Sequence, residues 1–148
     1  MNSTQEFDTE QFKKSVENLK SIKDLDYFLS FYDNDCFFKD PFHEITGKDS
    51  LKTLFESMFT KLNNPRFINL KICSNEAIIL MTWSFSYQRK EKGDQNFIQG
   101  ASSIKVNKNG LICRHYDYWD SCELFQAFKI LKKPLGLLKR IFSQGQIQ

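Results

Sequence analysis

Asp40-Pro41 is the first place in the chain where residue types and spacing indicate chemistry. Phe37 and Phe38 precede this dipeptide, and Pro41 restricts the turn that follows. A carboxylate at the end of an apolar strand, where water is scarce, can exchange protons near neutral pH. Asp40 is therefore a candidate general base. The alternative is an aspartate that only ends a strand and caps a turn.

A second candidate group lies in the segment 113–120, which is predicted to be the last strand. Alternate residues of a strand share a face, so His115, Asp117 and Trp119 lie on the same side. Burying an imidazole and a carboxylate without partners would cost several kcal/mol. The two groups must therefore bond one another, a water or a ligand.

The opposite register of this strand would point Arg114, Tyr116 and Tyr118 inward. We favour the first register because Trp119 is the bulkiest apolar side chain of the segment. His43, the only other histidine, lies in the turn after Pro41, which predicts a position on a pocket rim. A second titrating group at the pocket mouth is the alternative role for His43.

An aromatic face is predicted on the strand 77–87. Large apolar residues alternate there with small hydroxyl residues, which indicates a curved sheet whose concave side packs under helices. A plain sheet core is the alternative to a pocket. The large residues are Met81, Trp83, Phe85 and Tyr87.

Three helices are expected before the sheet. Asp8, followed by Gln11, is a start signal for the first helix. A second, short helix is predicted over 22–32. The third begins after Gly47 and ends before Asn63-Asn64-Pro65, because its apolar residues recur at helical spacing. These residues are Leu51, Leu54, Phe55, Met58, Phe59 and Leu62.

Beyond these helices the apolar period changes to two. We predict a brief strand over 36–39 and long antiparallel strands over 67–73, 77–87, 97–106 and 111–120, the last two joined at Asn109-Gly110. Helices followed by a meander of strands define an α+β fold. The chain is expected to form a single domain, 1–148, with a core of about 8–120.

The composition limits the function. A net charge of +3, without an aromatic-interleaved basic groove, argues against nucleic acid, and no glycine-rich phosphate loop is visible. We expect no metal and no cofactor, because two histidines without ligand spacing make a poor site. The four cysteines are read as small core residues in a reducing compartment. Without a visible secretory signal, the expected location is the cytoplasm.

The segment 121–148 is predicted to be a basic amphipathic helical extension. It carries lysines around an apolar stripe and has no acidic residue after Glu123. We expect a lid or a dimer contact at the open end of the sheet. A helix on a membrane surface is the alternative.

These residues together resemble the nuclear transport factor 2-like superfamily, and within it the SnoaL-like proteins and ketosteroid isomerases. The resemblance rests on Tyr32-x-x-Asp35, Asp40-Pro41-Phe42, Gly47 opening a helix, and Asn109-Gly110 leading to Tyr118-Trp119. It implies a cone-shaped curved antiparallel sheet packed on N-terminal helices (a cystatin-like α+β barrel). It also implies an apolar pocket and a homodimer.

The resemblance assigns roles unevenly. Asp40 matches the general base of the isomerases, and Tyr32 matches a supporting tyrosine. The two oxyanion-hole positions fall near Val16 and Ser102, and Phe55 stands where another tyrosine would be. The resemblance therefore does not extend to the oxyanion hole.

The predicted function is a metal-independent isomerase, cyclase or hydrolase acting on a small apolar carbonyl or lactone compound. Asp40 would be the base, His115 an acid or orienting donor, and Asp117 the group that sets the His115 tautomer. A non-catalytic carrier or sensor of a hydrophobic metabolite and a dimeric interaction module are the alternatives. The residues expected to bind the ligand are Tyr32, Phe55, Phe59, Met81, Trp83, Phe85, Ser102 and Trp119.

Overall fold

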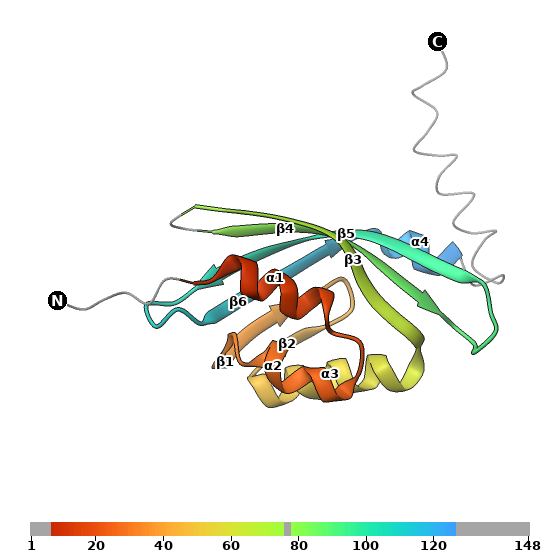
Figure 1. Ribbon diagram of the computed structural model, residues 1–148, viewed down its shortest axis with the longest axis horizontal. Helices are drawn as coiled ribbons and strands as arrows, with labels where there is room; N and C mark the ends of the chain where they lie inside the picture. Colours follow the sequence, from red (N-terminus) through yellow and green to blue (C-terminus); the bar gives the residue numbers. More distant parts are fainter. Residues whose placement is uncertain (1–6, 76–77, 127–148) are drawn as a thin grey trace, which may run out of the picture.

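The computed structural model describes residues 7–75 and 78–126 of the 148-residue chain. Helices from the first half of the chain pack on the concave side of one strongly curved sheet (Figure 1). The elements are α1 (Thr9–Glu17), η1 (Ile22–Asp24), α2 (Leu25–Leu29), β1 (Tyr32–Lys39), β2 (Glu44–Thr46), α3 (Lys48–Lys61), β3 (Asn63–Ser74), β4 (Ile79–Gln88), β5 (Gln95–Val106), β6 (Ile112–Trp119) and α4 (Ser121–Gln126).

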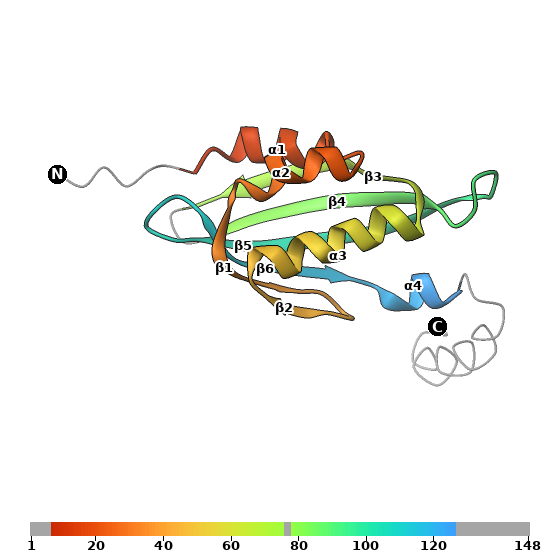
Figure 2. The same ribbon diagram turned by 90° about the horizontal axis from the view of Figure 1, so that it is seen from below.

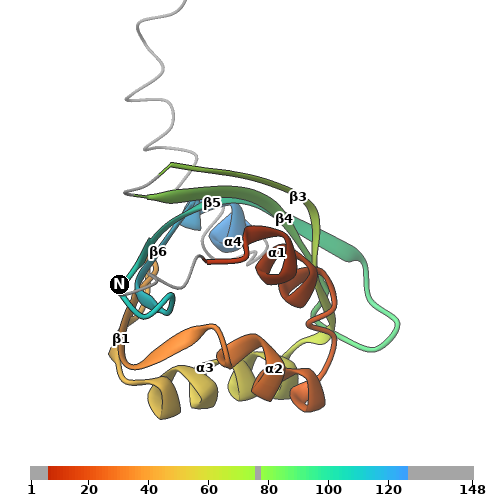
Figure 3. The same cartoon turned by 60° about the vertical axis from the view of Figure 1, so that its left-hand side comes forward.

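The sheet has six strands in the order β2-β1-β6-β5-β4-β3. Neighbouring strands are antiparallel except β1 and β6, which are parallel. The sheet bends from β1 through β5 to β3, and α2 and α3 lie across its open side (Figures 2 and 3). The predicted α+β fold, a curved and mostly antiparallel sheet on N-terminal helices, is confirmed.

The first helix begins where the sequence predicts. The Asp8 carboxylate accepts a hydrogen bond from the Gln11 amide at 2.9 Å, and an N-cap of this kind stabilises a helix by about 1 kcal/mol. Phe12 and Val16 are buried on the side that faces the sheet core.

The second helix is shorter than predicted. It consists of a 3-10 turn followed by α2, which ends at Leu29. Tyr32, predicted as the last residue of the helix, is the first residue of β1. The Phe31 carbonyl accepts from the Ile112 amide at 2.8 Å, which draws the chain into the sheet. Long-range pairing therefore overrides the helical spacing of the local sequence.

The parallel pairing of β1 with β6 was not predicted, because the partner strand lies far away in the sequence. In this register Phe38 is opposite His115, and Lys39 is opposite Tyr116. The next residues, Asp40 and Asp117, consequently emerge at the same end of neighbouring strands. The short strand β2, which also escaped prediction, turns back antiparallel along β1.

The third helix follows Gly47, whose φ of +96° suits a residue without a Cβ. Leu51 and Phe55 are buried, and the helix ends at Lys61, as the sequence indicates. The next strand begins directly at Asn63, inside the predicted stop signal. Asn64 and Asn69 adopt positive φ where the pairing of β3 with β4 is irregular.

The inner face of β4 and the register of β6 agree with the alternation in the sequence. Met81, Trp83 and Tyr87 are buried. His115 is buried on the inner face of β6, whereas Tyr118 on the outer face is 61% exposed. The predicted inward direction of the His115 and Asp117 strand face is therefore confirmed.

Gly100 leaves room for a large side chain of the neighbouring strand. The Trp83 indole lies across it, and a Cβ built at position 100 would come within 2.2 Å of the ring. The Trp83 ring can therefore occupy this position only because the facing residue of β5 has no Cβ.

One prediction about the cysteines was wrong. Cys36 is buried, but Cys73 is exposed, and Cys113 and Cys122 are partly exposed, so the four do not all fill the core. Cys73 faces outward because it lies opposite Leu80 on the convex side of the sheet.

Of the extension predicted over 121–148, the structure describes α4, and residues 127–148 lie outside the described part. No helix among the described residues is both long and apolar enough to cross a membrane.

Candidate functional site

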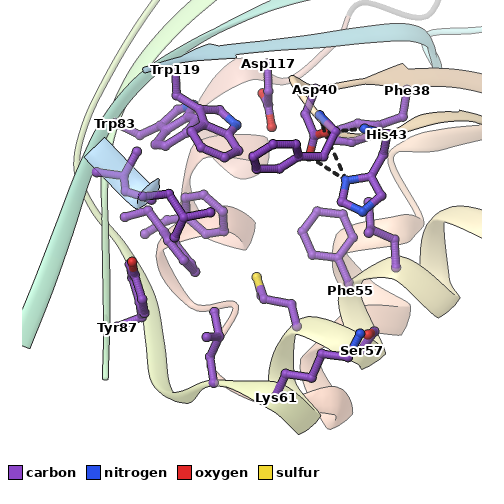
Figure 4. Close-up of a pocket in the computed structure, with 18 residues that line it drawn as sticks. Phe38, Asp40, His43, Phe55, Ser57, Lys61, Trp83, Tyr87, Asp117 and Trp119 are labelled. Carbon is purple, nitrogen blue, oxygen red and sulfur yellow. Dashed lines mark hydrogen bonds and ion pairs between the residues drawn. The ribbon is translucent and has the colours of Figure 1, made fainter. Parts of the chain in front are cut away.

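An aromatic cavity of about 370 Å³ lies between α3, the turn after β1 and the inner faces of β4 and β6 (Figure 4). This volume is in the range of small-molecule sites. The cavity is lined by Phe38, Asp40, Phe42, His43, Leu54, Phe55, Ser57, Met58, Lys61, Leu62, Phe67, Trp83, Phe85, Tyr87, Ile98, Asp117, Trp119 and Leu124.

Asp117 is the centre of a hydrogen-bond network in the cavity wall, called here the Asp117 network. Asp117 Oδ1 lies 2.8 Å from His115 Nε2 and 2.5 Å from Ser102 Oγ. His115 Nδ1 lies 2.7 Å from the Tyr32 hydroxyl, and Ser102 Oγ lies 2.8 Å from Trp83 Nε1. Two branches therefore converge on one carboxylate oxygen.

The direction of the first branch follows from Tyr32. Burial, with a smaller contribution from the charge of Asp117, holds the pKa of Tyr32 well above its usual value, so the hydroxyl keeps its proton. Among the described residues His115 Nδ1 is the only partner of this hydroxyl, which must therefore donate. The neutral imidazole then carries its proton on Nε2 and donates it to Asp117.

The second branch points the same way. The Trp83 indole N–H can only donate, so the Ser102 oxygen accepts from it and the Ser102 hydroxyl donates to Asp117. Asp117 Oδ1 thus receives two hydrogen bonds.

The other oxygen, Asp117 Oδ2, has no hydrogen-bond partner within the described part of the chain. The side chain is 15% exposed, and every fully buried side-chain polar atom of the described residues is satisfied. Oδ2 is therefore the oxygen accessible from the cavity, as the inward direction of Asp117 in Figure 4 also indicates.

A second carboxylate–histidine pair lies at the rim. Asp40 Oδ1 accepts from the amides of Phe42 and His43, both at 2.7 Å, and His43 Nδ1 lies 2.9 Å from Oδ1 and 3.0 Å from Oδ2. Asp40 therefore caps its turn, which was the alternative in the sequence, and also orients His43. The His43 side chain is 43% exposed.

The expected site residues divide into three groups. Those that line the cavity are Asp40, His43, Phe55, Trp83, Phe85, Asp117 and Trp119. Tyr32, Ser102 and His115 lie behind the wall as members of the Asp117 network. Met81 and Phe59 pack with the hydrophobic core instead of lining the cavity.

The expectation that Met81 and Phe59 line the pocket was therefore wrong. Met81 precedes the part of β4 that lines the cavity, and Phe59 packs against the hydrophobic core although its neighbours on α3 line the cavity. Phe38 and Lys61, which line the cavity, were not selected from the sequence. Phe38 is brought there by the parallel pairing with β6, and no sequence pattern indicated the cavity-facing position of Lys61.

The fold is the one shared by nuclear transport factor 2-like and ketosteroid isomerase-like proteins. Residues 18–115 match the family model of the SnoaL-like domain, well over half of the 148 residues. The chain belongs to the SnoaL-like domain family.

Solved structures support the same fold. A candidate polyketide cyclase from Pseudomonas putida KT2440 is 15% identical, with a TM-score of 0.67 over 78% of this chain and 93% of its own. A candidate isomerase from Bacillus subtilis is 18% identical, with a TM-score of 0.64 over 80% and 93%.

A third structure has a bound molecule. The protein with a ketosteroid isomerase-like fold from Catenulispora acidiphila DSM 44928, in complex with trimethylamine, is 10% identical, with a TM-score of 0.68 over 79% and 90%. No curated protein matches the chain significantly. At these identities the structures establish the fold and no more.

Proposed function

We propose that this protein is a metal-independent enzyme that moves a proton on a small apolar carbonyl or lactone compound, as an isomerase, cyclase or hydrolase. The observation that carries the proposal is Asp117: a carboxylate with one oxygen held by two donors and the other open to an aromatic cavity. A carboxylate held in this way is suited to accept a proton at a defined point.

Asp117 is the favoured base. Its Oδ2 would take the proton from a carbon next to the ligand carbonyl, and the electron pair would move to the carbonyl oxygen. Returning the proton to another carbon gives isomerisation, whereas attack of the enolate carbon on a second carbonyl gives cyclisation. The base role assigned to Asp40 from the sequence is less favoured, because both of its oxygens are engaged by His43 or the turn.

His43 is the favoured acid. Because its Nδ1 faces Asp40, Nε2 is the ring nitrogen left to exchange a proton with a ligand oxygen at the rim. His115 is a positioning residue in this scheme, since it contacts Asp117 and not the cavity. The names of the similar candidate cyclase and isomerase are consistent with such chemistry.

The proton transfer can be tested without knowing the natural substrate. We would incubate the protein with 2-tetralone, a small bicyclic ketone, in D₂O and follow exchange of its acidic carbon-bound protons by NMR. The protein should accelerate exchange, and Asp117→Asn should remove about 10²–10⁴-fold of that acceleration. Asp35→Asn, at an exposed position of β1, is the matched control. Full activity in Asp117→Asn would refute this role.

A non-catalytic carrier of a hydrophobic metabolite is the second candidate. Its support is the lack of an oxyanion donor at the two expected positions: Val16 is apolar, and the Ser102 hydroxyl is used by Asp117. A carrier would bind 2-tetralone without accelerating exchange, and Asp117→Asn would then leave binding unchanged or stronger.

We also propose that the protein is a homodimer through the convex face of the sheet. Leu80, Phe97 and Tyr118 on this face are exposed large side chains. Equilibrium sedimentation of the full chain tests this, with Phe97→Asp expected to shift the mass to that of a monomer.

A further inference from the structure

The cavity has opposite charges on opposite sides. Lys61, the last residue of α3, lines it on the side away from Asp40 and Asp117 (Figure 4). Within the described residues Lys61 has neither an ion pair nor a hydrogen bond. Lys52, on the same helix, is by contrast paired with Asp26 at 2.7 Å.

The remaining charged and titratable groups of the cavity leave this asymmetry in place. Asp40 is paired with His43 at the rim. Asp117 has no cationic partner among the described residues with lysine or arginine side chains, and its hydrogen-bond donors are His115 and the hydroxyl of Ser102. Tyr87 also lines the cavity, and burial raises the pKa of Tyr87, so its hydroxyl stays neutral. One side of the cavity is therefore negative and the other positive.

The wall between the two ends is suited to a flat guest. The Phe85 ring lies 4.8 Å from the Phe67 ring and 5.5 Å from the Tyr87 ring, measured between centroids. Rings in this arrangement offer apolar surface to a planar molecule, and aromatic pairs prefer such offset or tilted contacts.

We propose that Lys61 selects and orients the ligand: the cavity takes a flat aromatic or polycyclic molecule with one anionic group. The anion lies at Lys61, and the uncharged, proton-bearing end lies at Asp117. The reverse orientation would bring two negative charges together, and an uncharged ligand would gain nothing from Lys61. The orientation toward Asp117 as base depends on the function proposed above, whereas the preference for an anion does not.

Binding can be read from the two tryptophans. Trp83 and Trp119 are the only tryptophans of the chain, and both line the cavity. Their indole N–H signals in a ¹H–¹⁵N spectrum report occupancy directly. The probes are 2-naphthoate and 2-naphthamide, which share a ring system and differ in charge.

The protein should bind 2-naphthoate about fivefold more tightly than 2-naphthamide, the upper range for an exposed ion pair. Lys61→Met should lose this preference while keeping its affinity for the amide, and Lys61→Arg should retain it. Lys52→Met, which removes the same charge from the same helix, should also retain it. The preference should shrink at high salt.

Three results would overturn the proposal: no binding of 2-naphthoate, equal affinity for the two probes, or an unchanged preference in Lys61→Met. None of these measurements requires turnover. A protein that prefers 2-naphthoate but fails the exchange test with 2-tetralone would refute the proposed reaction and leave the ligand class standing.

Discussion

The cavity has two carboxylate–histidine pairs, and a different member of each pair is exposed to a ligand. In the inner pair His115 is buried behind the wall, and an oxygen of Asp117 faces the cavity. In the rim pair both oxygens of Asp40 are engaged, and His43 is the exposed member. The free atom, and not the residue type, therefore decides which member of a pair can contact a ligand.

The difference arises from the neighbours of each pair. The inner histidine lies between Tyr32 and Asp117 in a strand, so both of its nitrogens are used. The rim aspartate lies in a tight turn, where backbone amides and an imidazole converge on it. The inner pair therefore offers a carboxylate oxygen to the cavity, whereas the rim pair offers an imidazole whose side chain is 43% exposed.

The largest expected effect separates the two carboxylates. Asp117→Asn should lower the exchange of 2-tetralone by about 10²–10⁴-fold, because it removes the open base oxygen. Asp40→Asn should lower it less, because this change only loosens His43. Parallel rate measurements by NMR check the order. A greater loss in Asp40→Asn would move the base to the rim, as the sequence alone predicted.

A larger residue at position 100 should disturb the Asp117 network through Trp83. Gly100→Ala forces the Trp83 ring to move and weakens its bond to Ser102, which should destabilise the fold by about 1–3 kcal/mol. Urea unfolding measures the loss, with Lys105→Ala at an exposed position of the same strand as control. Unchanged stability would mean that Trp83 does not depend on the glycine.

Removing the Tyr32 hydroxyl tests how much its hydrogen bond to His115 contributes to stability. Tyr32→Phe keeps the shape but leaves the buried Nδ1 of His115 without its donor, at a cost of about 1–2 kcal/mol. Tyr27→Phe, at an exposed position, should cost nothing measurable. Equal midpoints of urea unfolding for these two variants would contradict the network.

The same tyrosine predicts a pH dependence. Its pKa is raised by burial above the ordinary value of 10.0, so the unfolded chain loses this proton first as the pH rises. The resulting stability is fully present below pH 10.0 and is lost above it, toward the folded pKa. Unfolding of the native protein between about pH 9 and 11 should therefore depend more steeply on pH than unfolding of Tyr32→Phe.

The smallest effect is expected at the rim. His43→Gln should change stability by less than about 0.5 kcal/mol, since the side chain is 43% exposed. The same variant should reduce exchange of 2-tetralone if His43 supplies the acid. A large loss of stability would show that the rim pair supports the fold as the inner pair does.

Much of the fold was predictable because its signals are local. The α3 stripe, the alternation of β4, the Asn109-Gly110 turn and the inward face of β6 all follow from side-chain period and turn chemistry. The SnoaL-like resemblance drawn from the motifs also agrees with the family match over 18–115. Residues close together in the sequence are enough to specify such features.

What the sequence by itself determined is the set of groups and the face on which each lies: an acid at the end of the first strand, and a histidine and a second acid on the inner face of the last strand. Only the tertiary structure decided which atoms remain free. The parallel pairing of β1 with β6 joins Tyr32 to His115, and the pairing of β4, β5 and β6 joins Trp83 and Ser102 to Asp117. Each of these bonds links residues from different strands, and a local pattern cannot specify which distant donor occupies a given lone pair.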